Sequence, residues 1–153
     1  MGQTILGLSH RKLVAFQPVP AANGLSIINI PTGPTYYAID LNYKRTGVDA
    51  TESEFKADVK WVRLKIGNKT CFEVSGKRLV DIFNKYYGIA FANGIAYIPL
   101  ARPWLKTVEA VENSAWGTAN VDTFTLEVEF AASAVSPTME AHALASVYSR
   151  DLG

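Results

Sequence analysis

Two glutamates, Glu127 and Glu129, are the clearest candidates for acid–base chemistry in this sequence. Glycosidases place two carboxyl groups on either side of the bond that they cleave, about 5 to 9 Å apart and normally on different elements. These two residues instead alternate with Leu126, Val128 and Phe130, as side chains do along one strand. The spacing therefore favours a solvated strand face, and a hydrolase that uses Glu127 and Glu129 is kept as an alternative.

Other side chains that commonly build active sites are scarce. The two histidines, His10 and His142, lie in opposite terminal segments, whereas a metal-binding jelly roll needs several clustered histidine and carboxylate ligands. Cys71 is the only cysteine, so the chain forms no internal disulfide. The sequence also lacks a Gly-x-Ser-x-Gly nucleophile elbow and a glycine-rich phosphate loop. We therefore predict no enzymatic activity, no metal and no cofactor.

The composition indicates one folded domain with little net charge. At 153 residues, 48% of them apolar, the chain is long enough to bury a sizeable core. Its 15 basic and 14 acidic residues leave a net charge of +1. Nucleic-acid affinity depends on neutralising phosphates, so we predict no specific nucleic-acid partner. No run of 18 apolar residues is present, so no membrane-spanning helix is predicted.

The elements that would position any site are mostly strands. Residues 122–130 show the clearest pattern, because apolar and polar residues alternate along this segment. Similar patterns predict further strands over 25–30, 35–43, 59–67, 69–75 and 95–100. Seven or eight short strands with long connections between some of them predict an all-β fold. It would be an antiparallel β-sandwich of the jelly-roll type.

One or two short helices accompany these strands. Thr51 and Glu54 have the spacing of a capping box, which predicts one helical turn. Ser75 can cap a helix over residues 76–87, in which apolar residues recur at helical spacing. Residues 104–117 fit either a helix or a strand.

The chain divides into three parts in this interpretation. Residues 1–24 form an N-terminal arm, and residues 25–131 form the jelly-roll domain. Residues 132–153 form a linker or tail, which is predicted to be helical because apolar residues fall on one side of a helix. These residues are Met139, Ala143, Leu144 and Val147.

Aromatic and basic side chains on the predicted surface are candidates for contacts with partners. Trp61, Arg63 and Lys65 alternate with the inward residues of the 59–67 strand. Arg102 and Trp104 follow the strand that ends near residue 100. We expect these five residues to belong to a protein interface, where aromatic residues and arginine are enriched. The alternative is a module that binds carbohydrate or another ligand through exposed aromatic side chains.

A small basic cluster lies in the predicted arm. Arg11 and Lys12 are candidates for contact with anionic lipid headgroups. Each basic residue near such a surface contributes about 1 kcal/mol.

Four segments follow one another along the sequence in a characteristic order. The first is the run from Ile30 to Asp40, Ile-Pro-Thr-Gly-Pro-Thr-Tyr-Tyr-Ala-Ile-Asp. The others are Val59 to Gly67, Ile95 to Leu100 followed by Arg102-Pro103, and Trp116-Gly117-Thr118 leading to Phe130. Taken in order, these segments resemble the major coat protein of corticovirus-type bacteriophages, whose icosahedral particles contain a membrane. The resemblance extends over roughly residues 25–148.

This resemblance implies a viral jelly roll, the first of two in a coat protein of a phage or prophage. It implies trimers of the full-length protein, copies of which tile an icosahedral shell over a lipid membrane. Other capsid or membrane proteins of the virion would be partners. The protein would be made in the cytoplasm of a bacterial host and reside in the virion. The tail from Pro137 resembles the linker to a second jelly roll, so the chain is interpreted as an N-terminal domain, with a complete single-barrel protein as the alternative.

Overall fold

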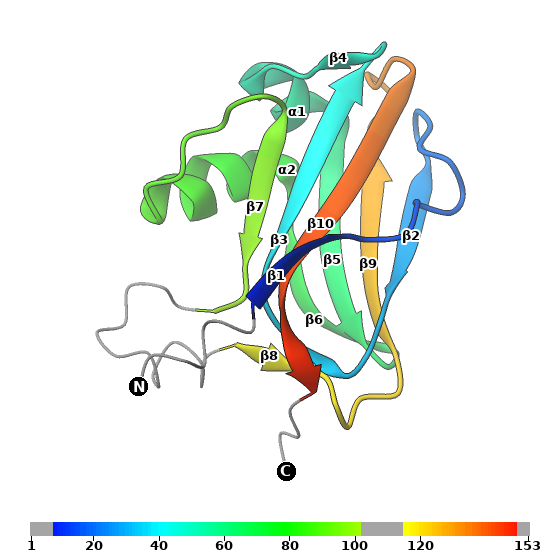
Figure 1. Cartoon of the computed structure of the whole chain (residues 1–153). Coiled ribbons are helices and arrows are strands. Elements are labelled where there is room, and N and C mark those ends of the chain that lie inside the picture. Colours follow the sequence, from blue (N-terminus) through cyan, green and yellow to red (C-terminus); the bar gives the residue numbers. More distant parts are fainter. Residues whose placement is uncertain (1–7, 102–114, 150–153) are drawn as a thin grey trace.

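Two antiparallel β-sheets pack face to face in the computed structural model, which describes residues 8–101 and 115–149 (Figure 1). In sheet A, the long strand β10 (Pro137–Ser149) pairs with β1 (Leu8–Lys12) on one side and β3 (Pro34–Arg45) on the other. The other edge of β3 pairs with β4 (Val48–Asp49), β7 (Ile95–Pro99) and β8 (Trp116–Gly117). Sheet B has the order β2 (Leu25–Ile30), β9 (Phe124–Phe130), β5 (Val59–Ile66) and β6 (Lys69–Val74).

The chain crosses between the two sheets repeatedly, as it does in a jelly roll. It passes from sheet B to sheet A between β2 and β3, between β6 and β7, and between β9 and β10. Strands that are distant in the sequence thereby become neighbours, such as β2 and β9. The predicted all-β antiparallel sandwich of the jelly-roll type is confirmed.

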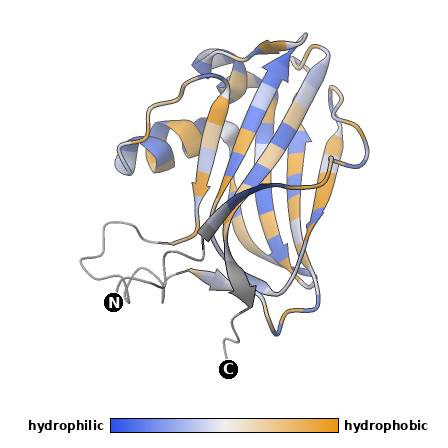
Figure 2. Ribbon diagram, viewed as in Figure 1, coloured by the Kyte–Doolittle hydropathy of each residue, from blue (hydrophilic) through white to orange (hydrophobic). Residues whose placement is uncertain are grey.

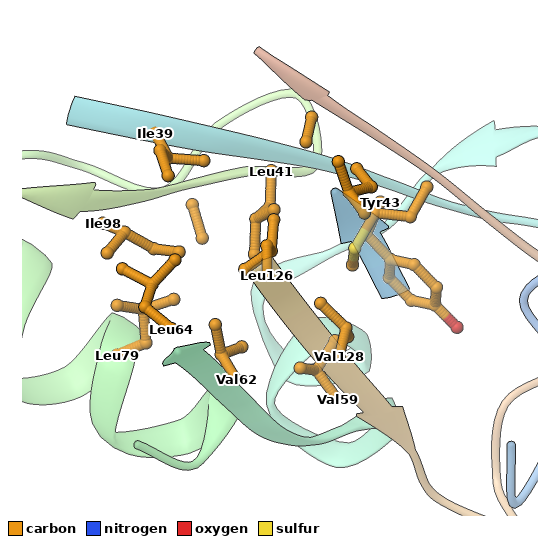
Figure 3. Close-up of a cluster of buried hydrophobic side chains, with 14 of the residues drawn as sticks. Ile39, Leu41, Tyr43, Val59, Val62, Leu64, Leu79, Ile98, Leu126 and Val128 are labelled. Atoms are coloured by element: carbon orange, nitrogen blue, oxygen red, sulfur yellow. The ribbon is translucent and has the colours of Figure 1, made fainter. Parts of the chain in front are cut away.

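The alternation of apolar and polar residues places one side of each strand in a shared core (Figure 2). On β9, Phe124, Leu126, Val128 and Phe130 are each at most 1% exposed. Figure 3 shows Leu41 of β3, from the opposite sheet, in the same cluster as Leu126 and Val128. Burying one large apolar side chain contributes about 1.5 to 3 kcal/mol relative to leaving it in water. Because these four apolar residues of β9 are all buried, the alternation in the sequence identified the core side of this strand correctly.

The helical prediction for the tail is wrong, because residues 137–149 form β10. Ten of its positions pair with β3 and five pair with β1, which makes β10 an interior strand of sheet A. Met139, Ala141, Ala143 and Ala145 face the core, while Glu140 faces outward. The spacing of Met139 and Ala143 fits both a helix and a strand, so that spacing does not separate them. In the strand, the backbone groups of β10 form hydrogen bonds with β3 on one edge and with β1 on the other, and this pairing favours a strand over a helix.

Sheet A also includes a strand from the predicted arm. β1 pairs with β10 from Leu8↔Ser146 to Lys12↔His142. Both segments that flank residues 25–131 therefore contribute strands to the sandwich.

Both predicted helical regions are present, with one difference in geometry. Thr51 caps α1 (Glu52–Asp58) in a complete capping box with Glu54. Ser75 caps α2 (Gly76–Arg78), which continues as a π-helical segment, η2 (Leu79–Asn84). π-helical turns are rare, and they occur mostly as single-turn bulges inside α-helices.

Asn84 is the residue that this π-helical segment positions. Its side chain is fully buried, and its Nδ2 donates to the carbonyl oxygens of Leu79 and Tyr97 at 2.9 and 2.8 Å. Its Oδ1 accepts from the backbone N–H of Tyr97 at 3.0 Å. Asn84 thus pairs with the backbone of β7, the strand beside β3 (Figure 1). Such coverage reduces the tendency of an edge strand to pair with another chain.

A buried polar network closes one end of the sandwich. Asp58 is 1% exposed and accepts hydrogen bonds from Tyr43 Oη and Ser133 Oγ, both at 2.8 Å. Arg45 lies 3.4 Å from Asp58 and donates to Glu54 at 2.9 Å. Burial raises the pKa of the Tyr43 phenol, and the bond to Asp58 raises it further. The network joins β3, α1 and the loop after β9.

Candidate assembly surface

The outward side of sheet B carries the main group of predicted interface residues. We call it the charged face and define it by Trp61, Arg63 and Lys65 of β5, Glu127 and Glu129 of β9, Glu73 of β6, and Leu25 and Ile27 of β2. The pairing register sets Trp61 beside Glu129 and Arg63 beside Glu127. Because side chains directly opposite each other on adjacent strands lie about 4.5 to 5.5 Å apart, residues of opposite charge can pair across the strands.

The basic residues of this face are paired with carboxylates of both neighbouring strands. Lys65 Nζ lies 2.7 Å from Glu127 Oε2. Arg63 Nε donates to Glu73, and its Nη2 lies 3.8 Å from Glu129 Oε2. The side chain of Glu127 is only 10% exposed, which corrects the prediction that it lies on a solvated face. The two glutamates serve as partners for cations and do not form an isolated carboxylate pair.

Trp61 is a partly buried member of the same face. The Arg63 guanidinium carbon lies 5.9 Å from the centre of its indole ring, a cation–π distance. A carbohydrate platform needs a free aromatic surface, whereas Arg63 already lies over this ring. Trp61 therefore lends little support to the carbohydrate-binding alternative.

Two other predicted surface residues, Arg11 and Lys12, do not join the charged face. Arg11 and Lys12 lie on β1 in sheet A, where Lys12 Nζ is 3.3 Å from Glu140 Oε1 and Arg11 Nε donates to Ser9 Oγ at 2.9 Å. Arg102 and Trp104 lie outside the described residues.

The two histidines, distant in the sequence, come together on sheet A. His10 and His142 stack with ring centres 5.1 Å apart, and His10 Nε2 lies 3.2 Å from Asp40 Oδ2. Even so, the described part of the chain holds no group of three or more histidine, cysteine or carboxylate side chains arranged for a metal ion.

A pocket of about 330 Å³ lies between α1 and the segment after η2. Val80, Ile89 and Phe91 line it, and Glu52 and Lys85 stand 3.8 Å apart beside it. The ionisable groups there form an ion pair with each other. The arrangement provides no set of converging acid and base groups.

Among the described residues, no helix is long and apolar enough to cross a membrane.

Sequence reasoning missed part of the charged face. The patterns in the sequence do not single out Glu73, Leu25 or Ile27. They place Glu127 and Glu129 on a solvated strand face, with hydrolysis as the alternative, and not in a protein interface. Alternation within one strand shows which residues share a side, but only the register shows which strands are neighbours. The excess of cations on β5 and of carboxylates on β9 is the signal that could have linked the two strands.

Comparison with known proteins places this geometry in a family of coat proteins. Residues 10–148 match the family model described as viral coat protein P2 N-terminal domain. The crystal structure of the major capsid protein P2 from bacteriophage PM2 superposes with a TM-score of 0.76 at 24% sequence identity. Its alignment covers 93% of this chain and 51% of that chain, so this chain spans about half the length of that protein. The search of curated proteins found no match.

Two further capsid structures share the fold at lower identity. The STIV MCP gives a TM-score of 0.63 at 14% identity, covering 92% of this chain and 40% of that one. The PBCV-1 virus capsid gives 0.58 at 11% identity, covering 90% of this chain and 45% of that one. At these identities the similarity establishes the fold alone.

Proposed function

We propose that this chain, which belongs to the family of viral coat protein P2 N-terminal domains, is the first of two jelly rolls in a major coat protein. It is a structural, non-enzymatic domain of a viral capsid protein. The observation that carries the proposal is the family match over residues 10–148, together with a superposition that covers half of the PM2 protein. The full-length protein forms trimers that tile an icosahedral shell over a lipid membrane, with other capsid or membrane proteins as partners. It is synthesised in the cytoplasm of the bacterial host.

The charged face is proposed as a lateral contact surface in this shell. A sheet face whose charged side chains are already paired offers a preorganised surface. Binding then costs less conformational entropy than it would for a flexible loop. Trp61, Arg63 and Lys65 contribute the aromatic and basic groups of this surface. Arg102 and Trp104 are proposed as further contacts.

The experiment uses the full-length gene product from infected or induced cells. We expect light scattering after size-exclusion chromatography to report a trimer. We also expect mass spectrometry of purified virions to find peptides of residues 8–149 and of a second jelly roll in one polypeptide. A full-length product that runs as a monomer and is absent from particles would contradict the proposal.

Arg11 and Lys12 are proposed to face the membrane side. Because β1 belongs to sheet A, charge reversal is a better probe than deletion of the arm. We expect Arg11→Glu/Lys12→Glu to reduce co-sedimentation with vesicles of anionic lipid, whereas Lys77→Glu/Arg78→Glu, at exposed residues of α2, should not. Equal binding of both variants would remove the role assigned to Arg11 and Lys12.

A further inference from the structure

The charged face has rows of opposite charge on its two central strands. β5 contributes the cations Arg63 and Lys65, and β9 contributes the carboxylates Glu127 and Glu129. Their pairing within the chain leaves part of each group accessible. The side chains of Arg63, Lys65 and Glu129 remain 22%, 32% and 32% exposed. These groups therefore retain hydrogen-bonding capacity toward a partner that approaches the sheet.

The order of these rows makes the face complementary to itself. Consider a twofold axis that runs parallel to the strands, above the gap between β5 and β9. Rotation about this axis sets β5 of one copy over β9 of a second copy. Each residue keeps its position along the strand direction. Each residue then faces the second copy's version of its own in-register neighbour. Arg63 faces the second copy's Glu127, and Trp61 faces the second copy's Glu129.

We propose that the charged face of sheet B docks onto the same face of a second copy of this chain, about a twofold axis between β5 and β9. The contact is isologous, so the Arg63–Glu127 pairing occurs twice. The proposal rests on the proposed function, because it identifies the partner of the proposed lateral contact surface as another identical barrel.

The charge on the face favours a copy of itself over a strongly charged partner. Two cations, Arg63 and Lys65, stand beside three carboxylates, Glu73, Glu127 and Glu129. A surface so close to neutral exerts little attraction on an anionic membrane or a nucleic acid. The face instead fits a partner that sets a row of carboxylates over the cations of β5 and a row of cations over the carboxylates of β9. A second copy of the same face does this, and complementary potentials favour that register over others.

The area of the face indicates a weak contact. Four strands at about 4.8 Å spacing and about six residues at 3.4 Å per residue give a flat footprint of roughly 400 Å² per copy. Specific stable interfaces bury about 800 Å² per partner. The docking is therefore expected to depend on concentration, and not to form a permanent dimer. Leu25, which is 38% exposed, and Ile27 add apolar area beside the central strands.

Two complementary variants test the arrangement. Arg63→Glu/Lys65→Glu makes both central rows acidic, and Glu127→Lys/Glu129→Lys makes both rows basic. By sedimentation velocity we expect weak dimerisation of the wild-type chain at about 0.5 mM and only monomers for each variant alone. An equimolar mixture of the two variants should form a heterodimer at least tenfold tighter than the wild-type dimer. About 0.5 M salt should weaken it, because added ions screen exposed charges.

Because Glu127 is nearly buried, Glu127→Lys can prevent folding. A second pair of variants therefore avoids this residue. Arg63→Glu and Glu129→Lys leave Glu127 unchanged, and circular dichroism and melting temperature establish that each variant folds. The matched control uses Lys12→Glu and Glu140→Lys, which reverse an exposed ion pair on sheet A. A mixture of these controls should stay as monomeric as its components.

The outcomes separate this inference from the proposed function. If both mixtures of folded charged-face variants stay monomeric, or if the sheet A control associates equally well, the twofold docking is wrong. The proposed coat function would still stand if the full-length product forms trimers and enters particles. If the full-length product does neither but the mixtures associate as expected, the docking surface stands and the coat role fails.

Discussion

At the scale of single residues, two glycines with similar backbone angles have different packing. Gly47 has φ +77° and Gly94 has φ +71°, a region that residues with a side chain rarely adopt. A Cβ at Gly47 would meet nothing within 4 Å, whereas a Cβ at Gly94 would lie 2.4 Å from the carbonyl oxygen of Tyr43. Gly94 also accepts a hydrogen bond from Tyr43 N at 2.8 Å. At Gly94 the backbone of β3 thus approaches too closely for any side chain.

We expect Gly94→Ala to destabilise the domain more than Gly47→Ala does. Adopting a left-handed conformation costs a residue with a Cβ about 1 to 2 kcal/mol, and Gly47→Ala should lose about that much. Gly94→Ala adds a clash with backbone, and we expect a total loss of about 3 kcal/mol or more. Urea denaturation of both variants measures the difference. Equal losses would show that the contact between Gly94 and β3 is looser than described.

At the scale of elements, α1 is held at one end of the sandwich by charged hydrogen bonds. The pKa of Glu54 is lowered below its ordinary value of 4.5, first by the backbone N–H of Thr51 and then by Arg45. The pKa of Asp81 is likewise lowered, chiefly by its bond to Lys56 of α1 at 2.9 Å. Both carboxylates are therefore stabilised as anions by folding.

The sign of the pH dependence follows from these lowered pKa values. A carboxyl group whose pKa falls on folding stabilises the fold fully above its unfolded value and loses that contribution as the pH falls through the folded value. We expect stability to decline below about pH 4.5, and Glu54→Gln to be less stable than wild type at pH 7 with a shallower decline in acid. Melting temperatures from pH 7 to pH 3 measure this. Glu140→Gln, at an exposed residue of β10, is the control, and a Glu54→Gln curve parallel to wild type would contradict the assignment.

At the scale of the whole molecule, β10 connects the predicted arm to the rest of sheet A. It lies between β1 and β3, and its inward residues include Met139 and Ala141. Without β10, β1 would lose its partner, β3 would lose the partner on one of its two edges, and one side of the core would be open to water. A segment that merely links two domains would contribute none of this.

We therefore expect a chain that ends at residue 136 to lose cooperative folding. Removal of an interior strand leaves unpaired backbone groups on both β1 and β3 and uncovers core side chains such as Ile39. The measurement is thermal unfolding followed by near-ultraviolet circular dichroism, with dye binding as a probe of exposed apolar surface. His142→Gln, which changes a partly exposed side chain of the same strand, should keep a sharp transition. A sharp transition in the shortened chain would mean that residues 8–136 suffice for the core.

The sequence predicted most strands well because their apolar and polar residues alternate. Phe124 to Phe130 shows this most clearly, since its four apolar residues are all buried as expected. The tail was predicted wrongly because alanines at positions 141, 143 and 145 are equally compatible with a helix. Likewise, residues 76–87 have helical spacing, but the π-helical geometry arises where Asn84 reaches Tyr97 of β7.

The candidate site could be predicted only one strand at a time. Alternation correctly placed Trp61, Arg63 and Lys65 on the side of β5 away from Val62 and Leu64. It could not show that Glu127 lies beside Lys65, because that contact joins residues far apart in the sequence. The register between β5 and β9 brings them to 2.7 Å and excludes most water from Glu127.

By itself the sequence determined the core-facing side of strands such as β5 and β9, the caps of both helical segments and the shortage of catalytic side chains. These are local properties, because a period of two or a capping residue acts within a few positions. Only the tertiary structure decided that the C-terminal segment is an interior strand and that cations and carboxylates form rows on sheet B. Those features depend on which distant strands pair, and pairing is settled by the burial of a core that the whole chain shares.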